Sequence, residues 1–203
     1  MQTTRGIVLR VIRHSDSRII VSLFTEHYGM LSAGVRLTRG GRTGGRSALW
    51  QMLNVVEMSV DYRPASELQK ISDVSISTPW MDLPYSPVKA SISMFLGEFL
   101  FRSLRGEGEN RPLFSFLYNS LRWLDEAEGN VANFHVLLMI RMTRFLGIWP
   151  GMAGYGRNMV YDMKNACFSA SIPVHGQYLE QRDAMWIPVL LEMDYSRMHR
   201  LKM

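Results

Sequence analysis

Residues 6–37, GIVLRVIRHSDSRIIVSLFTEHYGMLSAGVRL, decide the fold that the sequence predicts. Residues 6–13 and 18–24 are rich in β-branched side chains that alternate between two faces, and the polar residues 14–17 between them suit a hairpin turn. A third apolar run covers residues 30–37, and two more strand-like runs follow at residues 49–61 and 68–76. The spacing predicts a small barrel of five short strands.

The chain becomes basic and glycine-rich between the third and fourth of these runs. No acidic residue lies between Glu26 and Glu57, and four arginines stand among glycines, serine and threonines: Arg36, Arg39, Arg42 and Arg46. Glycine lets backbone N–H groups approach a phosphate, and arginine forms bidentate hydrogen bonds to phosphate oxygens. This pattern predicts a flexible phosphate-binding loop. The alternative is a solvated connection that only keeps the sheet soluble.

The charge of the whole chain also favours an anionic partner. The 203 residues carry a net charge of +5, with 47% hydrophobic and 20% charged residues. Nucleic acid, an acidic protein tail and a membrane surface are the partner classes that this charge allows. Arg10, Arg13 and Arg18 on the first hairpin extend the predicted basic track. Three aromatic side chains are candidates for base stacking or for the core: Phe24, Tyr28 and Trp50.

A helical region follows a stretch with three prolines, residues 78–87. We therefore expect a barrel domain over residues 1–78, a Pro-rich linker over 79–87 and a helical domain over 88–203. Apolar stripes of helical period predict helices over residues 88–104, 111–124 and 131–146. An irregular insert covers residues 148–173, with a short strand pair near residues 159–163 and 166–171.

The C-terminal part predicts an amphipathic segment over residues 183–193, kinked or split by Pro188, and then a new helix capped by Ser196. The sequence stops at Met203, soon after that helix begins. We therefore expect the chain to be truncated relative to its gene product.

Enzyme and metal chemistry find little support in the sequence. Cys167 is the single cysteine, which excludes intramolecular disulfides and four-cysteine zinc sites and fits a reducing cytoplasm. His14, Ser15 and Asp16 are adjacent in the expected hairpin turn, which is not the geometry of a catalytic triad. The first residues show no apolar signal core, and the sequence has no run of 18 apolar residues, so we expect neither a leader peptide nor a spanning helix. We expect no catalysis, no cofactor, no metal and no membrane partner.

Arg141 and Arg144 stand beside Leu138 and Phe145 on the third predicted helix. A basic edge beside an apolar groove can capture an acidic peptide with a hydrophobic end. The alternative is that these charges only interact with the helix dipole and keep the helix soluble.

The chain resembles the RecO family of recombination mediators, especially forms like those of Bacteroidetes. The resemblance covers the whole sequence and is carried by these segments: GIVL at 6–9, DSRIIV at 16–21, LFT at 23–25, YGMLS at 28–32, residues 49–58, DYR at 61–63, FLGIWP at 145–150, YDM at 161–163 and Phe168.

This resemblance implies an α+β protein with an N-terminal five-stranded OB-fold barrel and a C-terminal helical domain. It implies binding of single- and double-stranded DNA, annealing of complementary strands and, with RecR, loading of RecA onto strands coated by single-stranded-DNA-binding protein. It further implies that the acidic C-terminal tail of that coating protein docks on the helical domain, which favours Arg141 and Arg144. The expected location is the cytoplasm, at the nucleoid.

Some members of the family carry a four-cysteine zinc module after the segment that matches residues 145–150, and Cys167 alone cannot supply it. The family also usually continues for a few dozen residues beyond Met203. Two other functions stay open at this point: a protein-interaction adaptor that docks partner proteins, and an RNA-binding OB protein.

Overall fold

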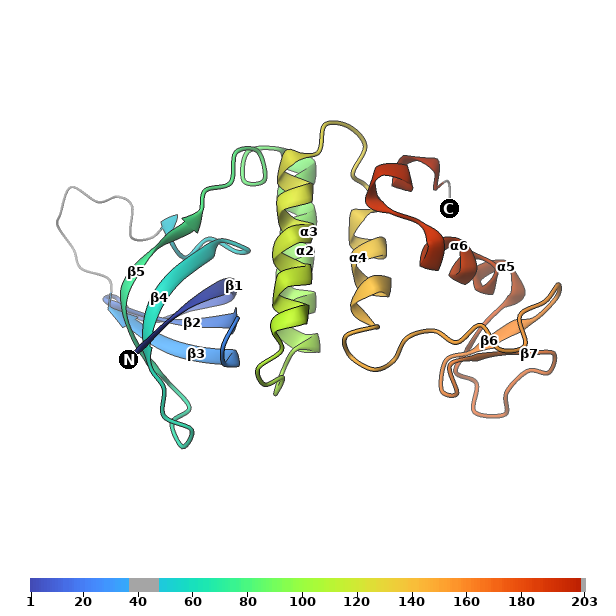
Figure 1. Ribbon diagram of the computed structural model, residues 1–203, viewed down its shortest axis with the longest axis horizontal. Coiled ribbons are helices and arrows are strands. Elements are labelled where there is room, and N and C mark those ends of the chain that lie inside the picture. The colour runs from blue at the N-terminus through green and yellow to red at the C-terminus, as the bar shows by residue number, and fades with distance from the viewer. Residues whose placement is uncertain (37–47, 202–203) are drawn as a thin grey trace. The chain divides into compact units, whose positions relative to one another are not determined.

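The computed structural model describes residues 1–36 and 48–201. The chain forms two compact units, Met1–Gly129 and Asn130–Met203 (Figure 1). The described part of the first unit contains the predicted sheet and two long helices. The second contains the remaining helices and a small sheet.

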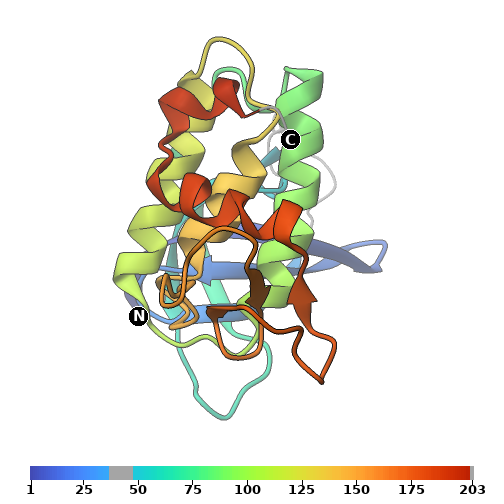
Figure 2. The same cartoon turned by 90° about the vertical axis from the view of Figure 1, so that its right-hand side faces the viewer.

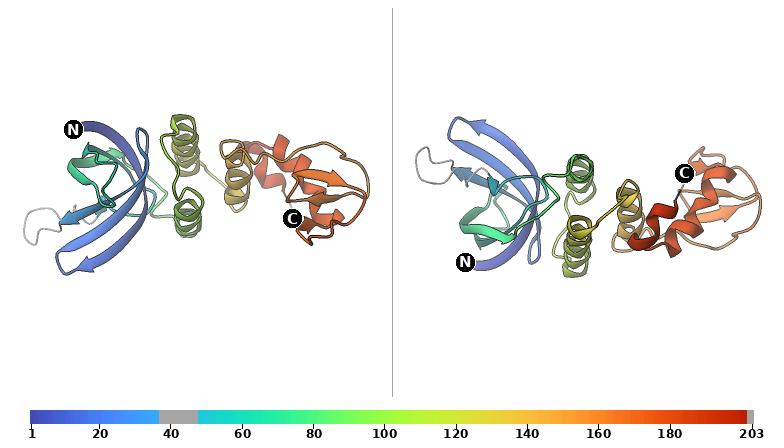
Figure 3. Two further views of the ribbon diagram at one scale, coloured as in Figure 1. Left: turned by 90° about the horizontal axis from the view of Figure 1, so that it is seen from below. Right: turned by 90° about the horizontal axis from the view of Figure 1, so that it is seen from above.

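Five antiparallel strands form the sheet of the first unit: β1 (Gln2–Ser15), β2 (Arg18–Thr25), β3 (Gly29–Arg36), β4 (Val55–Asp61) and β5 (Lys70–Thr78). Their order is β3-β2-β1-β4-β5, and the sheet curves strongly (Figure 3). Its two edge strands approach through a parallel bridge between Ala33 and Gln69, and the Gln69 N–H donates to the Ser32 carbonyl at 2.8 Å. The predicted α+β class with an OB-like N-terminal sheet is confirmed, although no continuous ladder closes that sheet.

The fourth strand begins later than the sequence predicted. Residues 49–54 form turns before β4, because Leu53 adopts a left-handed backbone conformation with φ of 63°. The Asn54 side-chain amide holds this turn by donating to the Ala48 carbonyl at 2.7 Å. The Leu53 N–H donates to the Val8 carbonyl at 2.7 Å, which fastens the turn to β1.

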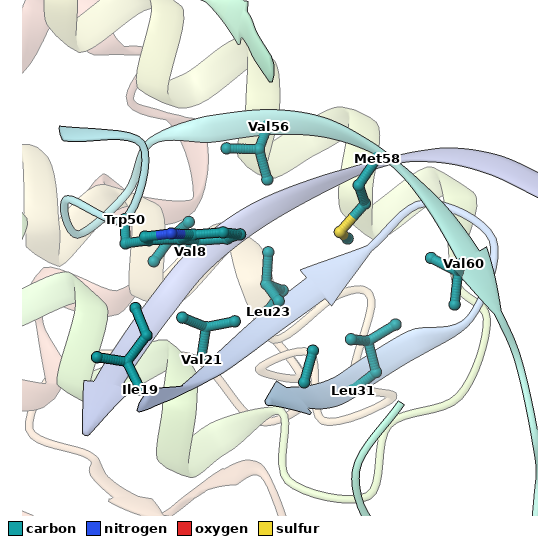
Figure 4. Close-up of a cluster of buried hydrophobic side chains, with 10 residues drawn as sticks. Val8, Ile19, Val21, Leu23, Leu31, Trp50, Val56, Met58 and Val60 are labelled. Atoms are coloured by element: carbon teal, nitrogen blue, oxygen red, sulfur yellow. The ribbon is translucent and has the colours of Figure 1, made fainter. Parts of the chain in front are cut away.

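The turn contributes Trp50 to the interior of the sheet. Figure 4 shows its indole beside Val8 at one end of the cluster, whose members are Val8, Ile19, Val21, Leu23, Leu31, Ala33, Trp50, Val56, Met58 and Val60. Trp50 is 6% exposed and Phe24 is fully buried on the other face of β2, where its ring lies 6.3 Å from that of Phe114. The core interpretation is therefore confirmed for Trp50 and Phe24.

Two helices, α2 (Pro87–Ser103) and α3 (Arg111–Glu126), lie side by side against the outside of the sheet (Figure 3). Pro87 occupies the first helical position of α2, and Asn110 caps α3 by accepting from the Leu113 N–H at 3.1 Å. Both helices agree with the predicted ranges. The apolar positions of α3 are buried as expected, whereas α2 buries Lys89 and Ser93 and exposes Phe95.

The connection between α2 and α3 docks on the start of β3. Gly29 has φ of 66°, and a Cβ built on it would lie 2.1 Å from the Gly108 carbonyl oxygen. The Met30 N–H donates to the Glu107 carbonyl at 2.9 Å. Only glycine allows this close approach of two backbones.

Most of the expected linker, residues 79–87, lies outside α2 and is fixed by buried polar groups. The Asp125 carboxylate on α3 accepts from the backbone N–H groups of residues 81–83 at 2.7–2.9 Å. Lys89 on α2 donates to the carbonyls of Asp125 and Ala127 at 2.9 and 2.8 Å and forms an ion pair with Asp82 at 2.7 Å. We call Asp125 and Lys89 with these partners the buried junction.

The second unit contains α4 (Phe134–Met142), β6 (Val160–Asp162), β7 (Cys167–Ser169), β8 (Tyr178–Leu179), α5 (Gln181–Ala184), α6 (Trp186–Glu192) and η1 (Tyr195–Arg200). Figure 2 shows its short strands beneath α5 and α6. The predicted strand pair is present as β6 and β7. The third predicted helix was too long, since α4 covers only Phe134–Met142 and residues 143–147 form turns.

Two further expectations need correction. The helix break lies at Met185, and Pro188 stands in the first turn of α6, where its missing N–H costs no hydrogen bond. The final predicted helix is a 3₁₀ turn, η1, rather than an α-helix. Its cap is Asp194 instead of Ser196, because the Asp194 carboxylate accepts from the Arg197 N–H at 3.0 Å.

Candidate nucleic-acid interface

Three of the predicted arginines lie on one face of the sheet. Arg18 on β2 is directly opposite Arg36 on β3, and Arg10 on β1 is opposite Ser22 on β2. Ile19 and the other odd-numbered residues of β2 point into the core, so the even-numbered ones point outward. We call Arg10, Arg18 and Arg36 together the arginine face.

Along β2, the outward-pointing residues become more exposed from Phe24 toward Arg18. Phe24 is fully buried beside α3, Ser22 is 6% exposed, Ile20 is half-buried and Arg18 is exposed. The hydroxyls of Ser22 and Ser32 share a hydrogen bond at 3.1 Å across the two strands. The surface between Arg10 and Arg18 is therefore formed by the small or apolar side chains of Ser22, Ser32 and Ile20.

The charges of Arg18 and Arg36 are not neutralised inside the fold. Among the residues that the structure describes, no carboxylate forms an ion pair with either side chain. Like charges directly opposite one another on neighbouring strands repel, so a bound anion would stabilise the pair. Arg10 is positioned by the ring of Phe101 on α2, whose centroid lies 4.8 Å from its guanidinium carbon.

The other arginines predicted to bind DNA are distributed differently. Arg13 is opposite Ile19 and therefore projects from the opposite face of the hairpin. Arg39, Arg42 and Arg46 lie outside the described residues.

An aromatic pair that the sequence did not reveal lies at the far end of β2. Tyr28, in the turn after β2, stacks on Tyr62 with ring centroids 4.6 Å apart, and its hydroxyl donates to the Gln2 side chain at 3.1 Å. Tyr62 is 45% exposed and presents the available ring surface of the pair. The two residues are 34 positions apart and meet only through strand pairing, so sequence spacing gave no signal.

The proposed peptide site in the second unit divides into buried and exposed parts. Leu138 is fully buried in the core. Arg141 donates to the Met193 carbonyl and lies over the ring of Tyr195, 5.2 Å from its centroid. Arg144 is exposed, with its guanidinium 6.0 Å from the centroid of Trp149, and Phe145 is half-buried.

The strongest cluster of titratable groups, around Asp162, holds the chain in a turn. Its carboxylate accepts from the backbone N–H groups of Lys164 and Asn165 at 2.9 Å and pairs with His175 at 3.2 Å. The backbone hydrogen bond from Asn165, followed by those from the Asn165 side chain and His175, lowers the pKa of Asp162 to about 2. Its oxygens are therefore engaged in holding this turn.

The described part of the chain contains neither a helix suited to a membrane nor a cluster of metal ligands. None of its helices is both long and apolar enough to cross a membrane. Within residues 1–36 and 48–201, no three His, Cys, Asp or Glu side chains gather as metal ligands.

Comparison with known proteins assigns both halves of the chain to one family. Residues 1–80 match the family model "Recombination protein O N terminal", and residues 84–202 match "Recombination protein O C terminal". A protein of Phocaeicola vulgatus named "DNA repair protein RecO" is 41% identical over 203 residues, covering all of this chain and 84% of that protein. A protein of Bacteroides fragilis with the same name is 38% identical over 98% of this chain and 83% of its own length.

Proposed function

This chain belongs to the RecO family of DNA repair proteins, and on that premise we propose that it binds DNA through the arginine face. In this proposal it is a non-enzymatic recombination mediator of the cytoplasm and nucleoid. It binds single- and double-stranded DNA, anneals complementary strands and, with RecR, helps to load RecA onto strands coated by single-stranded-DNA-binding protein.

The observation that carries the proposal is the uncompensated charge of Arg18 and Arg36 beside Arg10. Exposed guanidinium groups bind phosphate oxygens without losing an internal partner. The half-buried Ile20 and the bare backbone of Gly34 between them leave room for a strand to lie close to the sheet. Arg39, Arg42 and Arg46, which follow Arg36 in the sequence, extend the proposed contact as further phosphate ligands.

A salt series tests this proposal. Affinity for single-stranded DNA and the rate of strand annealing are measured for the native protein and for a variant with Arg10, Arg18 and Arg36 changed to Ala. Since each phosphate contact on a single strand contributes about 0.7 to the logarithmic salt slope, the variant should lose about 2 from that slope and bind more weakly. A second variant with Arg39, Arg42 and Arg46 changed to Ala measures the rest of the proposed track.

The matched control changes Arg102, Arg111 and Arg122 to Ala. These exposed helix arginines are each paired with a glutamate at 2.5–2.9 Å, so the control removes the same charge without touching the arginine face. Equal losses in both triple variants would mean that only net charge matters and would overturn the proposed interface. Tight binding to structured RNA in preference to DNA would favour an RNA-binding OB protein instead.

We further propose that Arg144 and Phe145, supported by Arg141 and the buried Leu138, bind an acidic peptide with a hydrophobic end. The observation that favours this site is exposed apolar surface beside a cation: Ile148 is 62% exposed and Trp149 is 38% exposed. A peptide of the tail of single-stranded-DNA-binding protein should bind the native protein and lose affinity several-fold with Arg144→Ala. If the peptide bound tightly while DNA did not bind, the chain would be an adaptor and not a DNA-binding mediator.

A further inference from the structure

A cavity opens at the place where the sheet fails to close. It lies between β3 and β5 and has a volume of about 230 Å³, and Arg36 of the arginine face is one of the residues that line it. The other lining residues are Gly34, Val35, Leu49, Trp50, Ile71, Ser72, Asp73 and Val74. A cavity of about 150 Å³ can hold a benzene molecule, so this volume has room for a single aromatic ring.

Strand β5 is irregular where it lines the cavity. Ser72 pairs with Ser59 and Ser75 pairs with Glu57, so Asp73 and Val74 together oppose only Met58. Asp73 has φ of 52°, in the left-handed region. Such bulges redirect side chains, and strained residues of this kind concentrate at binding sites.

The bulge places the exposed carboxylate of Asp73 at the edge of the cavity, whose lining is both polar and apolar. The Ser72 hydroxyl donates to one Asp73 oxygen at 3.0 Å, which fixes the side chain. A carboxylate has further acceptor sites that this single hydrogen bond does not use. Together with Trp50, Leu49 and Val74, which also line the cavity, it places an acceptor beside apolar side chains.

We infer that this cavity receives one unstacked nucleobase from a strand held on the arginine face, and that Asp73 accepts a hydrogen bond from the amino group of that base. The inference rests on the proposed function, because Arg36 belongs to both the cavity and the arginine face. Single strands are commonly read through splayed bases placed in such cavities. Carboxylates accept from the cytosine amino group, whereas thymine presents a carbonyl oxygen at the same position.

The experiment compares oligodeoxycytidine and oligothymidine of equal length, at slightly alkaline pH where cytosine is unprotonated. One hydrogen bond corresponds to about a five-fold preference for the cytidine strand. Asp73→Asn should abolish or reverse this preference, because the asparagine amide can donate to the thymine oxygen. Asparagine also tolerates a positive φ, so this variant keeps the local backbone.

Glu67→Gln is the charge-matched control, since Glu67 is exposed and lies outside the cavity lining. It should leave the ratio of the two affinities unchanged. Ser72→Leu narrows the cavity and should remove the preference while the salt slope stays the same.

The outcomes separate this inference from its premise. Salt-dependent binding with equal affinity for both strands overturns the base-reading cavity and leaves the proposed function standing. A cytidine preference that survives Asp73→Asn overturns it as well. Absence of salt-dependent binding to either strand overturns the proposed function and this inference together.

Discussion

The first unit places its charges in two contrasting ways. At the buried junction, Lys89 is 4% exposed and Asp125 is 7% exposed, and both have several partners inside the fold. On the arginine face, Arg18 and Arg36 are exposed and lie opposite one another without an internal counter-charge among the described residues. The charges of the buried junction therefore contribute to stability, whereas those of the arginine face are available to bind a ligand.

The largest effect is expected from Asp125→Ala. This change leaves three N–H groups of residues 81–83 without their acceptor, and breaking a buried charged network typically costs about 3–5 kcal/mol. Urea unfolding followed by circular dichroism measures the loss. Asp125→Asn is the control and should lose less, because one oxygen remains to accept. A loss below about 1 kcal/mol for Asp125→Ala would contradict a stabilising role of the junction.

Lys89→Met should follow with a loss of about 2 kcal/mol in the free energy of unfolding, because two buried carbonyls lose their donor. The methionine keeps most of the apolar stem, so packing is largely preserved. DNA affinity measured under native conditions should not change. A variant as stable as the native protein would show that water replaces the ammonium group.

Glu26→Gln should cost about 1 kcal/mol, since the Arg5–Glu26 pair is partly exposed. Arg5 donates to both Glu26 oxygens at 3.0 Å, and these hydrogen bonds hold the pKa of Glu26 below its ordinary value of 4.5. The stabilisation is therefore complete above that ordinary value and is lost as the pH falls through the lower pKa of the folded state. Thermal unfolding at decreasing pH should show a shallower acid slope for the variant; identical slopes would refute this assignment.

The smallest effect on stability, and of opposite sign, is expected from Arg18→Thr. Removing one of two opposing arginines relieves repulsion and should raise the free energy of unfolding by up to about 0.5 kcal/mol. DNA affinity should fall in the same variant. Arg63→Thr is the control, because Arg63 pairs with Asp61 at 3.0 Å and gains nothing from removal. A loss of stability in Arg18→Thr would show that the arginine face has internal partners.

Much of the fold could be predicted where the pattern is local. The presence of the first hairpin, the helices α2 and α3, and the short pair β6 and β7 follow from hydrophobic period and from capping residues such as Asn110. The limits of β1 were wrong, because it covers Gln2–Ser15 instead of residues 6–13 and leaves only residues 16–17 for the turn. The start of β4 could not be predicted, because the left-handed backbone of Leu53 interrupts an apolar run whose pattern is typical of a strand. The length of α4 was overestimated for a similar reason, since Phe145 and Leu146 continue its apolar period after the helix has ended.

The sequence by itself determined the OB-like sheet, the family and the basic character of the N-terminal half. These depend on composition, on residue order and on period, which are properties of the chain before it folds. The tertiary structure alone decided that Arg10, Arg18 and Arg36 share a face while Arg13 does not, because that depends on the bulges of β1 and on strand register. It also decided the buried junction and the cavity at Asp73, since both require groups distant in sequence to meet.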